Sequence, residues 1–350
     1  MAVPRFELAP GYGISRIIKG GWQLAGGHGA VDPAAAAGDM AAFVEAGITT
    51  FDCADIYTGV EEMIGMFLRR LRTQHGATAA SAVQVHTKCV PDRNRLPTLT
   101  RADIHDLIDR SLRRLGVDAL DLVQLHWWDY DVVGCVQAAQ WLDECRALGK
   151  LRHIGLTNFN AVHLATILAA GVQIVSHQVQ YSVLDRRPAQ GMAQRCAAAH
   201  IALLCYGALA GGFLSERWLG VAEPREPLEN RSLVKYHLII QEFGGWDRFQ
   251  ALLRVLVEIA RRHGATIGAV AMRWTLDQPG VGGVIVGARH AGHLAQTVGA
   301  CSITLDAEDR AAIARVQSEA TGPTGDVYDL ERVPDGRHAR IMRDNLNQHG

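Results

Sequence analysis

The sequence lacks several features that would assign it quickly to a class of protein. Its seven cysteines are scattered at positions 53, 89, 135, 145, 196, 205 and 301, and no two form a Cys-x-x-Cys pair. An odd number of thiols cannot all pair within one chain, so reduced cysteines are expected. No apolar run reaches the roughly 20 residues needed to cross a bilayer, and the first residues lack the basic-then-apolar order of a signal peptide. These absences predict a cytoplasmic protein.

The chain also has no excess of charge of either sign. Its 35 Lys and Arg residues are balanced by 36 Asp and Glu residues, which gives a formal net charge of -1. This balance provides no electrostatic reason to bind nucleic acid or an anionic membrane, and a small neutral or mildly charged ligand fits better. With 350 residues and 48% hydrophobic composition, the chain can build one large α/β domain or two ordinary ones.

Short apolar strands alternate with helical periodicity along most of the chain. The expected strands are 14–18, 48–52, 83–88, 120–126, 152–156, 174–180, 201–206 and 283–286, and the helices are 32–46, 60–71, 101–115, 132–148, 161–169, 188–199, 249–263 and 291–300. Eight strand-helix units predict a (β/α)8 barrel. A doubly wound open sheet is the competing architecture, but it needs a regular Gly-rich turn after its first strand, and residues 26–29 (Gly-Gly-His-Gly) are too irregular.

Three segments fall outside this alternation. Residues 6–8 and 14–17 are joined around Pro10 and Gly11, and they predict a β-hairpin that caps the bottom of the barrel. Residues 214–246, after the seventh strand, are too many for a plain loop, so a partly ordered lid or insertion is expected. The polar tail at 322–350 could wrap the barrel or contact a neighbouring subunit. We expect residues 1–350 to form a single domain, with the barrel at about 14–315.

Polar residues stand where the predicted strands end, which is where barrel enzymes place their catalytic groups. Asp52, Lys88 and His126 end three of these strands, and Tyr57 follows Asp52 by five residues. Asp52 can hold the Lys88 ammonium by a charge-assisted hydrogen bond, and a cation near a phenol lowers the pKa of the phenol. Tyr57 would then give a proton near neutral pH, while His126 would orient a carbonyl oxygen or share the proton transfer.

Each of these four residues also has an ordinary structural interpretation. A strand-end aspartate often caps the next helix, a lysine is usually solvated, and a lone histidine is usually a packing residue. Four complementary groups at the mouth of one predicted barrel favour a shared active site over four coincidences.

The segment 47–65, GITTFDCADIYTGVEEMIG, resembles the signature of the aldo-keto reductase family, with Thr58 where many members have Gly or Asn. The resemblance continues through HTKC around Lys88, LDLVQLHW around His126, GLTNFN at 155–160, SHQVQYS at 176–182, CYGALAGGFLS at 205–215 and VIVGARHAGHL at 284–294. It implies a (β/α)8 fold and reversible, nicotinamide-dependent reduction of aldehydes or ketones. It also places the catalytic tetrad of the family on Asp52, Tyr57, Lys88 and His126.

The same resemblance implies contacts to the cofactor. Thr157, Asn158 and Gln178 would hold the carboxamide, Tyr206 would stack on the nicotinamide, Gly207 and Leu209 would line the pyrophosphate path, and Gly287, Arg289, His293, Gln296 and Thr297 would lie at the adenosine end. Gly287, Ala288 and Arg289 are expected to open the last helix, whose N-H groups and dipole suit a phosphate. Because Arg289 could pair with a 2′-phosphate, NADP(H) is favoured. NAD(H) stays open, because the family commonly has Arg or Gln, Glu and Asn at the last three positions.

Trp22 and Trp127 are candidates for an apolar wall around the substrate, with core packing as the alternative for both. The leading hypothesis is an oxidoreductase acting on a small carbonyl or alcohol, with no nucleic-acid or membrane partner. A second is a cofactor-binding regulatory subunit with little turnover, against which the intact tetrad argues.

A third hypothesis is a metal-dependent barrel hydrolase. It would use Asp52, Asp55, His86, His126 and His177 as an improvised ligand set. No His-x-His pair ends an early strand, which argues against this interpretation and for a site without metal. The sequence indicates neither the physiological substrate nor the oligomeric state.

Overall fold

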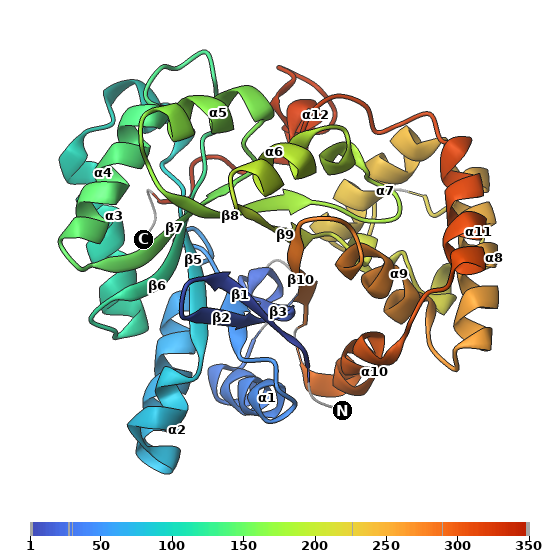
Figure 1. The fold of residues 1–350 in the computed structure, drawn as a ribbon, viewed down its shortest axis with the longest axis horizontal. Helices are drawn as coiled ribbons and strands as arrows, with labels where there is room; N and C mark the ends of the chain where they lie inside the picture. Colours follow the sequence, from blue (N-terminus) through green and yellow to red (C-terminus); the bar gives the residue numbers. More distant parts are fainter. Residues whose placement is uncertain (1–2, 27–28, 30, 226, 289, 348–350) are drawn as a thin grey trace.

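Eight parallel strands close into a barrel in the computed structural model, which describes all residues except 1–2, 27–28, 30, 226, 289 and 348–350. The barrel strands are β3 (Ile17–Gly20), β4 (Thr50–Asp52), β5 (Gln84–Cys89), β6 (Leu120–Leu125), β7 (Leu151–Thr157), β8 (Ile174–Gln180), β9 (Ala202–Tyr206) and β10 (Val281–Gly287). Consecutive strands are neighbours, and β10 pairs with β3 to close the ring. The predicted (β/α)8 barrel is therefore confirmed (Figure 1).

Helices connect the strands and surround the barrel. They are α1 (Pro33–Glu45), α2 (Val60–Ser81), α3 (Arg101–Leu115), α4 (Cys135–Ala147), α5 (Ala161–Ala169), α6 (Met192–Ala198), α8 (Trp246–Arg262) and α10 (Leu294–Gly299). Two further helices, α9 (Ile267–Leu276) and α11 (Ala307–Ser318), were not predicted. In α9 most side chains are buried, so the helix has no broad polar face from which helical periodicity could be recognised. None of the helices in the described part of the chain is long and apolar enough to span a membrane.

The bounds of α3 follow directly from its sequence. Thr100 accepts a hydrogen bond from the backbone N-H of Asp103, and the Asp103 carboxylate accepts one from the backbone of Thr100, which forms a capping box. Gly116 ends the helix in the left-handed region at φ 66°. Both signals are local, which explains why the predicted and observed bounds agree.

The other predicted helices, apart from 161–169, have bounds that differ by one or more residues in the structure, and in two of them a glycine explains the difference. The helix expected at 60–71 continues to Ser81, with a break at Gly76, where φ is 84°. The helix expected from residue 132 begins only at Cys135, because Gly134 before it has φ 141°. Glycine adopts such angles at little energetic cost, so it can break a helix or shift its start. The hydrophobic pattern of the sequence does not reveal these changes.

An antiparallel hairpin of β1 (Arg5–Ala9) and β2 (Tyr12–Ser15) covers the bottom of the barrel, as predicted. Its apolar side chains pack against residues that point into the barrel, including Ile18, Leu122 and Leu204. The prediction was wrong in joining 14–18 into one strand. Arg16 separates the hairpin from β3, because its guanidinium donates to the carbonyls of Leu276 and Val281 at 2.7 and 2.8 Å.

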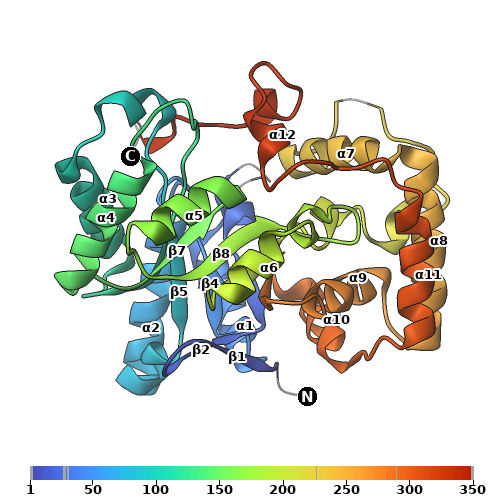
Figure 2. The same cartoon turned by 45° about the horizontal axis from the view of Figure 1, so that its top comes forward.

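The segment after β9, the seventh barrel strand, is a partly ordered insertion, as expected. It contains a 3-10 helix (Glu216–Trp218) and helix α7 (Arg231–Phe243), whose N-terminus is capped by the side chain of Asn230. The tail beyond residue 322 contains the short helix α12 (Asp329–Arg332) and wraps the barrel. Figure 2 shows it running from the side of α7 and α11, past α12, toward α3 and α4. It therefore passes over the face where the barrel strands end.

Candidate active site

A buried ion pair lies at the ends of β4 and β5. The Nζ atom of Lys88 is 2.8 Å from Oδ2 of Asp52, and it also donates to the carbonyl of Cys53 at 2.8 Å. Lys88 is 6% exposed and Asp52 is 4% exposed. Burial acts to lower the pKa of Lys88, but the charge of Asp52 raises it, and the net pKa lies above the usual value. Lys88 is therefore a cation at neutral pH.

The carboxylate of Asp52 is also fixed from two other strands. Its Oδ1 atom accepts a hydrogen bond from Nε2 of Gln178 on β8 at 2.6 Å and one from Nε2 of Gln124 on β6 at 3.3 Å. Charged acceptors make the stronger hydrogen bonds in a buried site. The ion pair is thus held by side chains of β4, β5, β6 and β8, which cannot shift independently of the barrel.

Tyr57 lies in the loop between β4 and α2, beside this ion pair. The Lys88 ammonium is 5.2 Å from the centroid of the Tyr57 ring, and the ring of Trp22 is 5.1 Å away on centroids. Burial is the largest influence on the pKa of Tyr57 and raises it, while the charge of Lys88 lowers it. The net pKa is raised, so the expectation that Lys88 brings it below the usual value is wrong: the desolvation of the phenolate outweighs the attraction to the ammonium.

His126 follows the end of β6 and completes the predicted tetrad at the same mouth. Its Nδ1 atom is 3.2 Å from the carbonyl oxygen of Thr157, and burial, with the charge of Arg332 next, lowers its pKa to about 3. The ring is therefore neutral at pH 7. Because a carbonyl can only accept, Nδ1 carries the proton and Nε2 presents a lone pair. This Nε2 atom is buried and has no partner among the described residues.

The residues predicted to hold the nicotinamide gather at the ends of β7, β8 and β9. The hydroxyl of Tyr206 donates to Oδ1 of Asn158 at 2.8 Å, and the backbone N-H of Asn158 donates to the carbonyl of Gln178 at 3.0 Å. Asn158 has φ 62°, a left-handed conformation that Asn tolerates better than most residues. A half-buried aromatic ring beside two amide side chains fits a flat ring that carries a carboxamide. Thr157 ends β7 beside them and is buried.

The predicted pyrophosphate path follows β9 directly. Gly207 and Leu209 precede a 3-10 helix at Ala210–Gly212, and Gly207 has φ 80°. A Cβ atom at Gly207 would lie 2.7 Å from the hydroxyl oxygen of Tyr236. Both the backbone angle and this close approach require glycine.

The predicted adenosine end is less regular than the sequence indicated. Gly287 is the last residue of β10 rather than the start of a helix, and Arg289 lies outside the described residues. A short 3-10 helix (Ala291–His293) and the six-residue α10 follow, with His293 and Gln296 exposed and Thr297 buried. The side chain of Gln23 lies against Gly287, where a Cβ atom would be 2.1 Å from Nε2 of Gln23.

The two predicted substrate tryptophans have different surroundings. Trp22 is half-buried and packs on Tyr57. Trp127 is 1% exposed and lies in the hydrophobic core, with its Nε1 donating to the carbonyl of Val132 at 3.0 Å, so packing describes it better than a substrate wall. Trp128 faces the site instead: its ring meets that of His126 edge to face, with centroids 4.3 Å apart.

Sequence reasoning did not find the residues that the insertion and the tail bring to the site. The ring of Tyr328 lies edge to face with His126 at 5.6 Å on centroids, and Arg332 donates to the carbonyls of Asn158 and Trp127 at 2.9 and 2.7 Å. Lys235 of α7 lies over the ring of Tyr206 at 4.9 Å from its centroid. These residues occupy irregular segments without periodicity, so no sequence signal assigns them to the mouth of the barrel.

A second group of buried charges lies on this side, and we call it the Arg187 cluster: Asp185, Arg187, Lys235 and Glu331. Arg187 is 2.7 Å from Asp185 and 3.1 Å from Glu331, and Lys235 is 3.8 Å from Glu331. Burial acts to raise the pKa of Glu331, but the charges of Arg187 and Lys235 hold it at about 2. The cluster therefore joins the tail, the insertion and the loop after β8 by charge.

The ligand set proposed for a metal hydrolase is not supported. Among the residues that the structure describes, no three His, Cys, Asp or Glu side chains come together in an arrangement that could hold a metal ion. His86 contacts Tyr12 at 3.1 Å, and His177 accepts from the backbone N-H of Phe159 at 3.1 Å.

Comparison with known proteins identifies the class to which this fold and site belong. A model of the Aldo/keto reductase family matches residues 16–318, so the chain belongs to this family. Members of the family are oxidoreductases that use nicotinamide cofactors on small carbonyl or alcohol substrates.

Individual relatives share between a fifth and a third of their residues with the chain. The flagellar radial spoke protein 5 of Chlamydomonas reinhardtii is 32% identical over 64% of this chain, which spans only 49% of that protein. The NADH-specific methylglyoxal reductase of Escherichia coli (strain K12) is 25% identical over 88% of this chain and 95% of its own length. The structure of an aldo/keto reductase from Klebsiella pneumoniae in complex with NADP and acetate superposes with a TM-score of 0.69 and 21% identity, covering 93% of this chain and 98% of that one.

Proposed function

We propose that the chain is an NADP(H)-dependent oxidoreductase that interconverts aldehydes or ketones and alcohols, with Tyr57 as general acid and base. The observation that carries this proposal is the convergence of three groups. The Lys88 ammonium is 2.8 Å from the Asp52 carboxylate and 5.2 Å from the centroid of the Tyr57 ring. A buried cation beside a phenol stabilises the phenolate that remains after the phenol has given up its proton.

The protonation states suit the reductive direction. The raised pKa of Tyr57 keeps its hydroxyl protonated at neutral pH, which is the form that donates. A bound nicotinamide would supply the hydride to the carbonyl carbon. The O-H bond of Tyr57 breaks as its proton passes to the carbonyl oxygen, and the phenolate then takes a proton from solvent. In the oxidative direction, the phenolate accepts the proton of the alcohol.

His126 has a separate role in this proposal. Since its Nδ1 proton is engaged by Thr157, the free Nε2 lone pair accepts a hydrogen bond and does not donate one to a ketone. It therefore suits an alcohol hydroxyl, and a neutral ring adds no positive charge beside Lys88. The edge-to-face rings of Trp128 and Tyr328 restrict the rotation of the imidazole.

The cofactor would lie along the ends of β7 to β10. Asn158 and Gln178 would hold the carboxamide and Tyr206 the face of the nicotinamide, with Gly207 and Leu209 along the pyrophosphate. We favour NADP(H) because Arg289 follows Gly287 at the adenosine end and because the related structure from Klebsiella pneumoniae contains NADP. NAD(H) is the competing choice, since a relative in Escherichia coli is named NADH-specific.

A spectrophotometric screen of carbonyl and alcohol panels with NADPH and with NADH tests this proposal. We expect turnover of at least one panel, with kcat/KM higher for NADPH than for NADH. Tight cofactor binding without turnover on any panel would contradict the proposal and favour the regulatory-subunit hypothesis. A preference for NADH would overturn the choice of cofactor and leave the reaction class intact.

A further inference from the structure

The loop that carries Tyr57 is attached to a segment almost 300 residues away in sequence. Asp55 lies between Asp52 and Tyr57 and is 3% exposed. Its Oδ1 atom accepts from the backbone N-H of Ile56 at 3.0 Å, and its Oδ2 atom accepts from the backbone N-H of Val90 at 3.1 Å. The Oδ2 atom also accepts a hydrogen bond from Nδ2 of Asn347 at 3.2 Å, so the tail reaches the loop itself.

The amide of Asn347 is held in one orientation by its partners. Besides Asp55, its Nδ2 atom donates to the carbonyl of Val90 at 2.6 Å, and its Oδ1 atom accepts from the guanidinium of Arg110. Its backbone N-H donates to Oδ1 of Asp92 at 2.8 Å. With both hydrogens of Nδ2 and the oxygen engaged, the amide cannot flip without breaking three hydrogen bonds. Asn347 thus bridges the β4-α2 loop, the end of β5 and helix α3.

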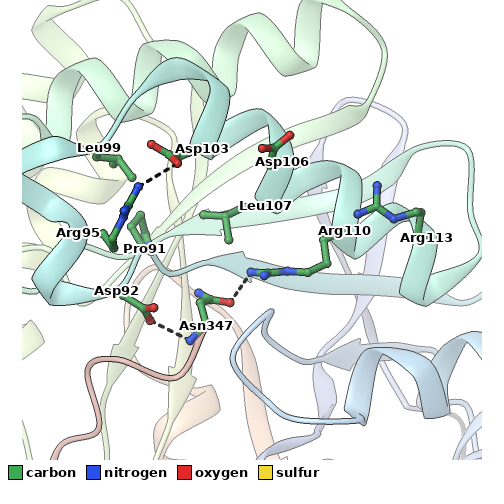
Figure 3. Close-up of a pocket in the computed structure, with 10 residues that line it drawn as sticks. All are labelled: Pro91, Asp92, Arg95, Leu99, Asp103, Asp106, Leu107, Arg110, Arg113 and Asn347. Atoms are coloured by element: carbon green, nitrogen blue, oxygen red, sulfur yellow. Dashed lines mark hydrogen bonds and ion pairs between the residues drawn. The ribbon is translucent and has the colours of Figure 1, made fainter. Parts of the chain in front are cut away.

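Figure 3 shows how Asn347 sits in the wall of a cavity of about 770 Å³ between the tail and α3. Arg110 extends from α3 toward its side chain, and Asp92 meets its backbone from below the helix. This cavity is separate from the tetrad, because none of the four tetrad residues lines it. At the edge of this cavity, the hydrogen bond from Asn347 to Asp55 connects the tail to the Tyr57 loop.

Neighbouring tail residues attach elsewhere. The carbonyl of Asp344 accepts from the backbone N-H of Arg93 at 2.7 Å, and Oδ1 of Asn345 accepts from the backbone N-H of Asn94 at 3.0 Å. Both contacts anchor the tail to the loop after β5, and neither involves the β4-α2 loop. The chain therefore provides two asparagines, Asn345 and Asn347, that are two positions apart and differ in whether they touch the Tyr57 loop.

We propose that Asn347 is a positioning residue for the reaction, which acts through Asp55 to fix the loop that presents the Tyr57 hydroxyl. This inference rests on the proposed role of Tyr57 as proton donor. The tetrad residues Asp52 and Lys88 lie on barrel strands, whereas Tyr57 lies on a loop. This loop is held through Asp55, which contacts Val90, Arg114 and Asn347. Proton transfer depends steeply on donor geometry, so a displacement of about 1 Å in this loop reduces the rate by up to about 100-fold.

The test compares Asn347→Leu with Asn345→Leu, two substitutions that remove an amide of the same size from the same segment. We expect Asn347→Leu to lower kcat by about 10- to 100-fold, with KM and the Kd of NADPH changed by less than about twofold. The primary isotope effect with deuterated NADPH should rise, because the chemical step becomes slower relative to product release. Asn345→Leu should change kcat by less than about twofold.

A second variant keeps the inference testable if Asn347→Leu does not fold. Asp55→Asn should lower kcat in the same way, and the losses should be less than multiplicative in the double variant, because the two substitutions share the Asn347-Asp55 hydrogen bond. Equal effects of Asn347→Leu and Asn345→Leu, or multiplicative losses in the double variant, would overturn the inference. Absence of turnover in the wild type would instead contradict the proposed function.

Discussion

The Asp52-Lys88 pair and the Arg187 cluster are both buried charge networks at the same mouth of the barrel, but they are built differently. The first joins the ends of adjacent strands, where backbone pairing fixes the positions of both side chains. The second joins the loop after β8, the insertion helix α7 and the tail helix α12. The Asp52-Lys88 pair is therefore part of the barrel, whereas the Arg187 cluster attaches the irregular segments to the barrel.

This difference predicts that the Asp52-Lys88 pair acts on the reaction, whereas the Arg187 cluster acts on the attachment of the tail. Lys88 is within 5.2 Å of the ring of the proposed proton donor, so a change in its charge acts on the reaction. Glu331 and Arg187 form an ion pair that holds the tail. The tail in turn contacts His126 through Tyr328 and the loop after β6 through Arg332. A substitution in the Arg187 cluster therefore acts first on stability. The following substitutions test whether the two networks separate in this way.

The largest effect is expected for Lys88→Met. Removing the ammonium leaves the Asp52 carboxylate beside the Tyr57 phenolate with no compensating charge, so turnover should fall by about 1000-fold. Steady-state kinetics with saturating NADPH measures the loss. The matched control is Lys150→Met, whose surface ion pair with Asp109 should matter little to turnover. A Lys88→Met variant that keeps a tenth of wild-type turnover would contradict the proposed role.

Glu331→Gln should have the next largest effect, on stability rather than on chemistry. The pKa of Glu331 is held at about 2, against a usual 4.5, so the ionised form contributes about 3 kcal/mol to the free energy of unfolding at neutral pH. A lowered carboxyl pKa stabilises the fold fully above pH 4.5, and the contribution disappears as the pH falls through 2. Urea unfolding of both proteins at pH 7 and pH 3 measures it.

The difference between wild type and Glu331→Gln should shrink to about half at pH 3. Glu229→Gln serves as the control, since Glu229 forms an exposed ion pair with Arg217 at 3.4 Å, and its effect should be below about 0.5 kcal/mol. Equal effects of the two substitutions would show that the Arg187 cluster does not hold the tail.

A smaller loss is expected for Lys235→Met. The ammonium of Lys235 lies over the ring of Tyr206, but Glu331 keeps Arg187 as a partner when Lys235 is removed. The free energy of unfolding should fall by about 1 kcal/mol, which is typical of a partly buried cation-π contact. Thermal unfolding measures this change. A loss as large as that of Glu331→Gln would mean that Lys235, rather than Arg187, is the main partner of the tail.

The same contrast explains which features the sequence predicts. The barrel, the hairpin and the bounds of α3 follow from short-range signals: alternating apolar residues, a turn and a capping box. The shared position of Asp52, Lys88 and His126 could be predicted, because parallel barrel strands all end on the same side of the barrel. The positions of Tyr328, Lys235 and Asn347 could not be predicted, because they depend on long-range contacts that leave no local sequence pattern.

The pKa of Tyr57 marks a further limit. The sequence indicates that a cation lies near the phenol, and the structure places it there. The net direction of the shift depends on how far the phenol is removed from water, and burial outweighs the cation. The charged neighbour of Tyr57 was thus predictable from the sequence. The degree to which Tyr57 is buried was not, because it depends on how all the segments around the mouth of the barrel pack together.

Tyr57→Phe tests the central claim most directly, because it removes one hydroxyl and leaves the ring that packs on Trp22. Turnover and the Kd of NADPH should be measured on the same preparation, the latter from the quenching of tryptophan fluorescence. We predict that turnover falls below a thousandth of the wild-type value, on the order of general acid catalysis, while the Kd changes by less than about threefold. Retained turnover, or a loss of cofactor affinity equal to the loss of turnover, would contradict Tyr57 as the proton donor.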